Sequence, residues 1–432
     1  MSGPKFSVII PTRERADTLR YTLQTCLDQD FESYEIVVCG NCSSPETKAV
    51  VDSFASPRIV YHRSPTPLSM GENWNLAYSK SSGQYVTFIG DDDALMPFAF
   101  SALDSFLKRE PARAMRWNCA VYSWPNNARA DLADYLGLSF LRGRRRIDGR
   151  QAIKDVLAGR DSATILPNVY HGCASRDVLE DIRTRSGHVF ASFHCDTFSS
   201  FAIAHSAGEY VSFDAPLSIS GFSASSNNIA FNFMRGKSEL TRLHKDENAL
   251  GGLRLHPIVP DIHTDFVPVA DSFLTAKDAL FPDDDDLTLD RRAMISRFLA
   301  APPIDTLDDW PPVVAELRRS VSDDPELLRW FEDKVREVAP VAQTRRDFKA
   351  PFEAVYEDSM HLFPSRYGVS DVEGATRLAA RLLGYRGDAA ISSEPAGAFA
   401  RKITLHRRKL LLKWLHYRAG TGAAPLSSSQ PA

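Results

Sequence analysis

The chain has 432 residues, of which 44% are hydrophobic and 25% charged, and its formal net charge is −4. This length allows two or three domains, and the near-neutral balance gives no reason to expect a nucleic-acid partner. No stretch approaches the roughly 20 apolar residues that span a bilayer, and the start MSGPKFSVIIPT lacks the cationic segment of a signal peptide. Together with six scattered cysteines, these features predict a cytoplasmic protein.

The N-terminal part of the chain alternates between strand and helix patterns. Short runs rich in β-branched and aromatic residues predict strands at 5–10, 34–39, 58–62 and 84–89. The segments between them repeat apolar residues at helical spacing and predict helices at 16–29, 43–55 and 69–81. This alternation is typical of a mostly parallel sheet with helices on both faces.

Three aspartates, Asp91, Asp92 and Asp93, follow the last of these strands in the stretch FIGDDDAL. Charges this close raise each other's cost of ionisation, so water or a cation should offset them. One interpretation is a solvated turn that also caps a helix at 97–109. The other is a site for Mg²⁺ or Mn²⁺, because these cations prefer carboxylate oxygens and ligands gather at the carboxyl ends of parallel strands.

Motifs for other kinds of site are weak or missing. Cys39 and Cys42 spell C-x-x-C, but no second ligand pair accompanies them for zinc, and they do not begin a thioredoxin-like unit. No G-x-G-x-x-G follows the first strand, and no G-x-x-x-x-G-K-[ST] occurs. A bound phosphate is therefore expected to be held through a metal ion.

The order of these features resembles a family 2 glycosyltransferase of the GT-A fold. The resemblance is carried by FSVIIPTRER, by the Asn-containing turn in YEIVVCGNCSS, and by SMGENWNLAYSKSSGQYVTFIGDDDAL, and it covers about residues 4–235. It implies an α/β GT-A domain over 1–235 with a mostly parallel sheet that binds a nucleoside diphosphate sugar. A mainly α-helical accessory region at 236–418 and a disordered tail at 419–432 are expected to follow.

The resemblance also implies roles for particular residues. The donor nucleotide is expected to contact Pro11, Thr12, Arg13, Glu14, Asn41, Asp91 and Asp92, and Mn²⁺ or Mg²⁺ is expected to bind Asp91, Asp92 and Asp93. Two departures from the family pattern stand out. Gly40 occupies the place of an Asp that reads the base, which leaves the base open, and Gly90 replaces the first Asp of the common D-x-D form, which leaves open which carboxylate touches metal.

The resemblance places a catalytic base about one hundred residues after the metal run, where Asp196 precedes the apolar helix pattern TFSSFAIAHSAG. The competing interpretation is an N-cap of that helix. His171 and His194 are further candidates, although a lone His in an aromatic segment is more often structural. Glu209 and Asp214 are the remaining acidic choices.

Three further segments of the sequence are rich in charged residues. Two of them allow two interpretations, and one allows a single interpretation. The arginines of RGRRR at 142–146 form either a solvated loop or a site for an anionic acceptor. Asp283 to Asp286 are expected to be a solvated cap region. The basic helix pattern at 402–418 either packs on the body or lies on the inner face of an anionic membrane.

The sequence therefore predicts a metal-dependent, inverting glycosyltransferase that moves a sugar to a hydroxyl of a glycan or glycolipid. A sugar-1-phosphate nucleotidyltransferase is an alternative, but it should carry a Gly-rich loop after the first strand, and PTRERADT has no Gly. A non-catalytic carbohydrate-binding relative is the third possibility, with Gly40 as a sign of lost function. The sequence does not identify the sugar, the base, the acceptor or the oligomeric state.

Overall fold

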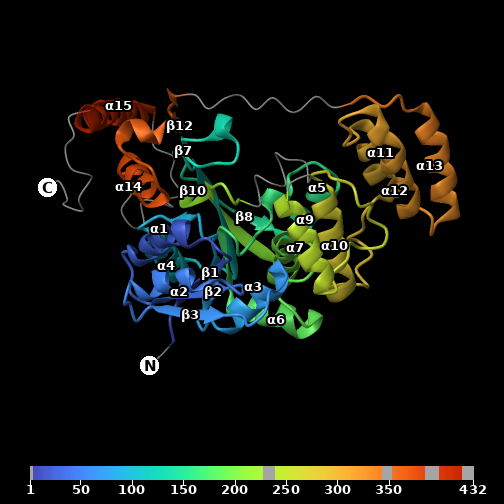
Figure 1. Cartoon of the computed structure of the whole chain (residues 1–432), viewed down its shortest axis with the longest axis horizontal. Helices are drawn as coiled ribbons and strands as arrows, with labels where there is room; N and C mark the ends of the chain where they lie inside the picture. Colours follow the sequence, from blue (N-terminus) through green and yellow to red (C-terminus); the bar gives the residue numbers. More distant parts are fainter. Residues whose placement is uncertain (1–2, 227–238, 343–352, 385–397, 421–432) are drawn as a thin grey trace.

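The computed structural model describes residues 3–226, 239–342, 353–384 and 398–420. Figure 1 shows a central sheet with helices packed around it and a group of helices that extends to one side. The expected tail at 419–432 lies almost entirely outside the described residues.

The predicted strands and helices of the N-terminal part are present. Its four strands are parallel and lie in the order β3-β2-β1-β4, which are β3 (Ile59–Arg63), β2 (Tyr34–Gly40), β1 (Phe6–Thr12) and β4 (Tyr85–Phe88). The helices between them are α1 (Ala16–Leu27), α2 (Pro45–Asp52) and α3 (Met70–Ser79). This part of the molecule is the alternating α/β unit that the sequence pattern predicts.

Beyond β4 the sheet becomes mixed. Its further strands are β5 (Ala94–Leu95), β6 (Ala114–Ser123), β7 (Tyr135–Ser139), β8 (Arg144–Asp148), β9 (Gly172–Ser175), β10 (Glu209–Phe222), β11 (Ala354–Val355) and β12 (Ser359–Leu362). Among the described strands beyond β4, only β6 and β10 pair in parallel, while β9 joins β4 to β6 with antiparallel pairing on both sides. The parallel pairs are thus confined to two portions of the sheet, which has twelve strands in the described part of the chain.

Two apolar cores cover the two faces of the sheet, as alternate strand residues require. Val8 and Ile10 of β1 face the core formed with α1, α2, α4 (Ala99–Arg109) and the C-terminal helices α14 (Val372–Leu383) and α15 (Ala398–Gly420). Ile9 faces the other core, to which α3, α5 (Gly149–Leu157), α6 (Arg176–Ser186), α7 (Cys195–Ala207) and α10 (Val267–Leu280) contribute. The fold is therefore a sheet between two helical layers.

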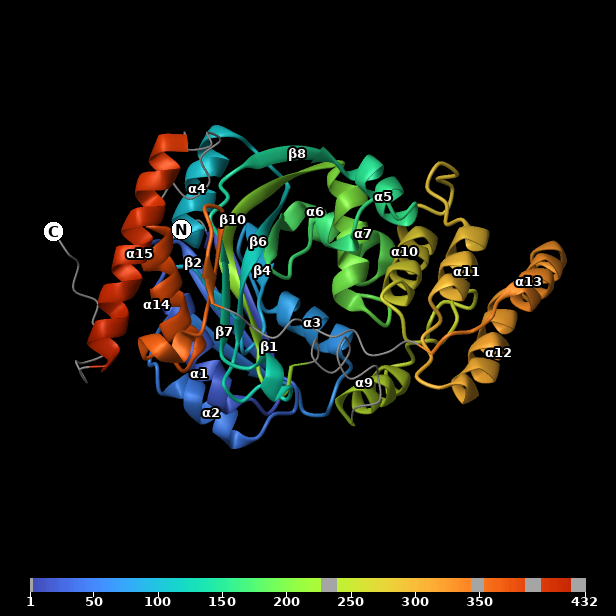
Figure 2. The ribbon, with the colours of Figure 1, turned by 90° about the horizontal axis from the view of Figure 1, so that it is seen from above.

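The region 236–418, which the sequence analysis expects to be a helical accessory part, packs against more than one side of the sheet domain. Helices α9 (Glu239–Leu250), α11 (Arg291–Ala300), α12 (Trp310–Ser320) and α13 (Pro325–Glu337) follow the sheet, and α10 packs on α7. The chain then returns, since β12 pairs with β7 and α14 contacts α1. Figure 2 shows α14 and α15 on the opposite side of the molecule from α11–α13. The boundary at 235 stays a prediction.

The acidic run at 283–286 is solvated as expected at Asp283, Asp285 and Asp286, which are exposed, but it does not cap the following helix. The cap of α11 is Asp290, whose side chain accepts a hydrogen bond from the Ala293 backbone amide. Asp284 and Asp286 instead form ion pairs with Arg150 of α5. The run therefore ties the loop after α10 to the body of the molecule. In the part of the chain that the structure describes, no helix has the length and apolar character to cross a membrane.

Candidate active site

The carboxyl ends of β1, β2 and β4 meet at one edge of the sheet because these strands are parallel. The Asn41 amide donates to the Thr12 carbonyl at 2.8 Å, which joins the turns after β2 and β1. The Thr12 hydroxyl donates to Asp91 Oδ2 at 2.6 Å, which joins the turn after β1 to the aspartate run. Residues predicted from three separate motifs are thus brought together.

Asp91 and Asp92 are buried and lie beside one cation. Arg15 Nη1 is 3.0 Å from Asp91 Oδ1 and 3.8 Å from Asp92 Oδ1. Asp92 Oδ2 also accepts hydrogen bonds from the hydroxyl and backbone amide of Ser223, at 2.6 and 3.2 Å. Burial raises the pKa of Asp92 to about 7 against the opposing effect of Arg15, so this carboxyl holds its negative charge weakly.

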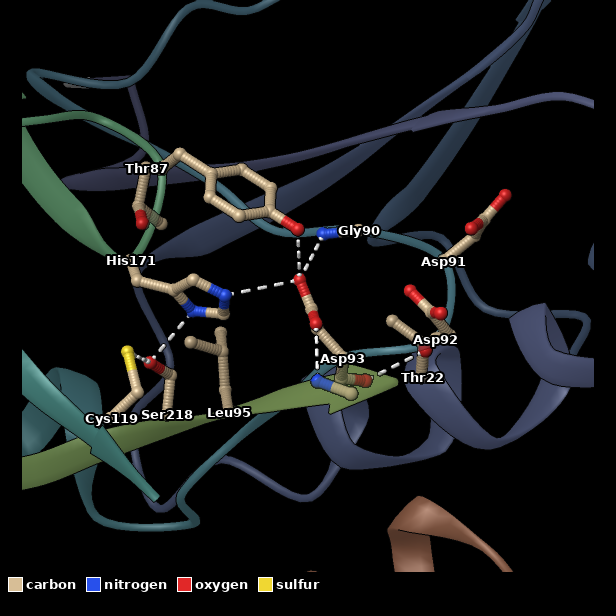
Figure 3. Close-up of polar contacts among 12 residues, drawn as sticks. Thr22, Thr87, Gly90, Asp91, Asp92, Asp93, Leu95, Cys119, His171 and Ser218 are labelled. Atoms are coloured by element: carbon tan, nitrogen blue, oxygen red, sulfur yellow. Dashed lines mark hydrogen bonds and ion pairs between the residues drawn. The ribbon is translucent and has the colours of Figure 1, made fainter. Parts of the chain in front are cut away.

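Asp93 has a separate set of partners. Its Oδ2 accepts hydrogen bonds from the Tyr170 hydroxyl and the Gly90 amide, each at 2.6 Å, and its Oδ1 accepts one from the Gly221 amide at 2.7 Å. Figure 3 shows its carboxylate turned toward His171 and away from Asp91. Asp93 therefore connects the end of β4, through hydrogen bonds, to β10 and to the segment before β9.

His171 completes this buried cluster. Its Nε2 lies 3.2 Å from Asp93 Oδ2, and its Nδ1 lies 2.9 Å from the Ser218 hydroxyl. Burial lowers its pKa, but Cys119 and the Asp93 carboxylate outweigh this effect, so the pKa of His171 is raised well above its ordinary value of 6.5. His171 also has a φ of 55°, a strained conformation for a residue other than glycine. The sequence analysis named His171 as a candidate, but nothing in NVYHGCAS indicates this ion pair.

The expected set of three metal-binding carboxylates is not found as a set. Within the described ranges, no group of three or more His, Cys, Asp or Glu side chains could hold a metal ion. Asp93 does not fit because its two oxygens accept hydrogen bonds from Tyr170, Gly90 and Gly221. Asp91 and Asp92 differ, because the Oδ1 atom of each faces the same cation, Arg15, so these two carboxylates fit a cation placed between them.

The predicted donor-binding residues line one side of this edge. Arg13 forms an ion pair with Glu247 of α9, and Glu14 accepts a hydrogen bond from the Ser44 amide at 2.8 Å. Asn41 exchanges two hydrogen bonds of 2.8 Å with the backbone of Leu68, so its amide supports the loop before α3. A cavity of about 250 Å³ lies beside them, lined by Thr66, Pro67, Leu68, Ser69, Glu72, Glu247, Leu250 and Gly251.

Gly40 has a steric explanation. A Cβ on Gly40 would lie 2.6 Å from the Tyr61 hydroxyl, so a larger residue at position 40 would require the Tyr61 side chain of β3 to move.

Asp196 lies in the first turn of α7 but is not its cap. The N-cap is His194, and α7 begins at Cys195, so the alternative interpretation of Asp196 as an N-cap is wrong. The Asn168 side chain donates to the Asp196 carbonyl at 3.1 Å and accepts from the Tyr170 amide at 2.8 Å. Because Tyr170 bonds to Asp93, this chain of contacts links Asp196 to the aspartate cluster.

Comparisons with known proteins find relatives of the N-terminal part. Residues 7–160 match the family model for glycosyl transferase family 2. Over this segment the chain is similar to family 2 glycosyltransferases. The GalNAc(5)-diNAcBac-PP-undecaprenol beta-1,3-glucosyltransferase of Campylobacter jejuni is 38% identical over 104 residues, which is 23% of this chain and 33% of that protein.

Other relatives match over similarly short segments. The UDP-Glc:alpha-D-GlcNAc-diphosphoundecaprenol beta-1,3-glucosyltransferase WfaP of Escherichia coli is 24% identical over 104 residues, or 24% of this chain and 41% of that protein. The chain therefore spans less than half the length of these curated relatives. Among solved structures, S. aureus TarS 1–349 in complex with UDP-GlcNAc has a TM-score of 0.48 at 16% identity, covering 77% of this chain and 88% of that one.

Two groups of candidates lie away from the transferase site. Glu209 begins β10, whereas Gly221 near its end contacts Asp93, so Glu209 and Asp214 lie roughly 20 Å or more along the strand from the aspartates. Glu209 instead pairs with Arg146. Within 142–146, Arg144 pairs with Glu110, and the segment 144–148 is strand β8, so these arginines support the sheet edge.

Proposed function

We propose that this glycosyltransferase domain transfers a sugar from a nucleoside diphosphate sugar to a hydroxyl of a glycan or glycolipid, with inversion at the sugar carbon. The observation that carries the proposal is the meeting of Thr12, Arg15, Asp91 and Asp92 at the ends of adjacent parallel strands. This edge suits a diphosphate, because Arg15 and a metal ion held by the two carboxylates would supply the positive charge that a diphosphate needs.

The proposed donor site runs from the aspartates to the cavity beside α3. The nucleoside lies over the turn Pro11–Glu14 and reaches the loop that Asn41 supports, and the diphosphate lies toward Asp91 and Asp92. Asp91 and Asp92 are the residues that would hold Mn²⁺ or Mg²⁺. Such an ion supplies charge neutralisation for the departing diphosphate.

Asp196 is the proposed general base. It would take the proton from the acceptor hydroxyl as that oxygen attacks the sugar carbon opposite the diphosphate, so the C–O bond forms while the bond to the diphosphate breaks. Its place supports this role, because Asp196 lies in the first turn of α7 and Asn168 connects its backbone to Tyr170, which bonds to Asp93 beside the proposed donor site.

The proposed acceptor is a lipid-linked glycan at the cytoplasmic membrane face, in polysaccharide biosynthesis. The names of the C. jejuni and E. coli relatives describe acceptors linked to undecaprenol diphosphate. Helix α15 also fits a membrane surface, since Leu412 and Leu415 pack inward while Trp414 and Tyr417 are 47% and 71% exposed. It contains seven Lys and Arg and no Asp or Glu. Cosedimentation with anionic and neutral vesicles tests this contact.

The experiment that tests the function follows the fate of a panel of nucleotide sugars, with and without Mn²⁺ and with lipid-linked acceptors. Release of nucleoside diphosphate that needs Asp91 supports a transferase. Consumption of a sugar 1-phosphate and a nucleoside triphosphate would instead indicate a nucleotidyltransferase. Binding without turnover of any donor would indicate a non-catalytic relative.

A further inference from the structure

The Asp91–Asp92 pair already has a positively charged neighbour inside the protein. Arg15 Nη1 lies 3.0 Å from Asp91 Oδ1 and 3.8 Å from Asp92 Oδ1. Arg15 Nη2 also donates to the backbone carbonyl of Ser225. Only 19% of the Arg15 side chain is exposed, and both carboxylates are almost fully buried. The guanidinium therefore lies where a cation can reach both carboxylates.

A divalent ion at this pair would compete with the guanidinium for the same two oxygens, Asp91 Oδ1 and Asp92 Oδ1. Mg²⁺ binds carboxylate oxygens at about 2.0–2.1 Å and keeps several further oxygen ligands around it. Asp91 Oδ2 and Asp92 Oδ2 are not free alternatives, because they accept from Thr12 and Ser223. Two cations beside one buried pair would also repel each other with little screening.

We propose that Arg15 is the resident counter-ion of the Asp91–Asp92 pair, and that a divalent cation binds these carboxylates only by displacing it. The displaced guanidinium then pairs with the donor diphosphate, for which its planar fork suits two parallel hydrogen bonds. This second statement rests on the proposed function, whereas the displacement itself does not.

The displacement has a consequence at the end of β10. Arg15 holds the Ser225 carbonyl, and Asp92 holds the amide and hydroxyl of Ser223. When Arg15 leaves, the turn at 223–225 loses the hydrogen bond at Ser225 and keeps those at Ser223. Binding of the cation should therefore speed amide hydrogen exchange in a peptide covering 218–226.

The test measures Mn²⁺ binding to the donor-free protein by calorimetry. Arg15→Gln removes the competing charge and is expected to bind Mn²⁺ roughly tenfold or more tightly than wild type. Arg15→Lys keeps a charge and should fall between them. Arg20→Gln is the matched control, because Arg20 lies in the following helix α1 with an exposed side chain outside the site, and it should bind Mn²⁺ as wild type does.

The double change Arg15→Gln with Asp92→Asn assigns the site, since it should lose the added affinity. Equal Mn²⁺ affinity in Arg15→Gln and wild type would overturn the proposal. A double variant that binds Mn²⁺ as tightly as Arg15→Gln alone would overturn it too. If Arg15→Gln does not fold, exchange at 218–226 in wild type decides instead, and no change at saturating Mn²⁺ would overturn it. None of these readings needs a donor, so they are independent of the transfer assay.

Discussion

Replacing Asp93 by Asn tests whether this aspartate is part of the framework or a ligand group. Asn keeps the shape of Asp but has one oxygen and one NH₂ group. If the oxygen of the Asn side chain accepts from Tyr170 and Gly90, the NH₂ group of that side chain faces the backbone amide of Gly221. Both of these groups are hydrogen-bond donors, so no hydrogen bond forms between them. In either orientation at least one buried amide loses its acceptor, and His171 loses its counter-charge.

The expected loss can be estimated from these contacts. A buried donor without an acceptor costs about 1–3 kcal/mol, and removing one member of a buried ion pair costs about 3–5 kcal/mol. The two effects overlap at His171 and Asp93, so we expect Asp93→Asn to lower the free energy of unfolding by about 3–5 kcal/mol.

Urea unfolding followed by tryptophan fluorescence measures this loss, with Asp92→Asn as the matched control. Asp92 has a pKa raised to about 7 and gives up its charge readily, so its variant should lose about 1 kcal/mol or less. A framework role for Asp93 would be refuted if both variants were equally stable and Asp93→Asn lowered only donor affinity.

Three other predictions follow from the site and its surroundings. Asp196→Asn should lower kcat about 10²–10⁴-fold without changing donor affinity or stability, and near-normal kcat in a folded variant would reject the base. Gly40 offers no side chain to the base, so affinities for two nucleoside diphosphates should be comparable, and selectivity of several thousandfold would contradict this. Burial raises the pKa of Asp271 to about 6, so its stabilising effect is complete below about pH 3.8 and is lost as pH rises through 6. Asp271→Asn should therefore make stability less pH-dependent between pH 4 and 6 than in the wild type, as urea midpoints of the two proteins across that range would show.

The parts of the fold that depend on local pattern could be predicted. Apolar alternation defines β1 to β4, and helical spacing defines α1 to α3, because each pattern is complete within a few turns of chain. The location of Asp91 at a strand end followed from the same reasoning. Strand partners from distant segments could not be predicted, since nothing in the four residues of β12 indicates that β7 is its neighbour.

The roles of single charged residues were the hardest to predict. An aspartate before a helix suits both a cap and an ion pair, and only three-dimensional position shows that Asp290 caps α11 while Asp284 pairs with Arg150. Arg15 reads as one of several charges in PTRERADT, yet its partner Asp91 lies 76 residues later. Such pairings depend on the whole sheet being assembled.

During synthesis, strand β7 is made well before its partner strand β12. Its partner β12 ends at Leu362, which is synthesised 140 residues after Phe222 at the end of β10. At about 5–20 residues per second, the ribosome needs roughly 7–28 s for that stretch. During this time one edge of β7, with Leu136 and Leu138, has no strand partner and presents open backbone groups to other chains. Nascent chains that stall between these points, or truncations before β12, are therefore the forms in which this protein is most exposed to aggregation.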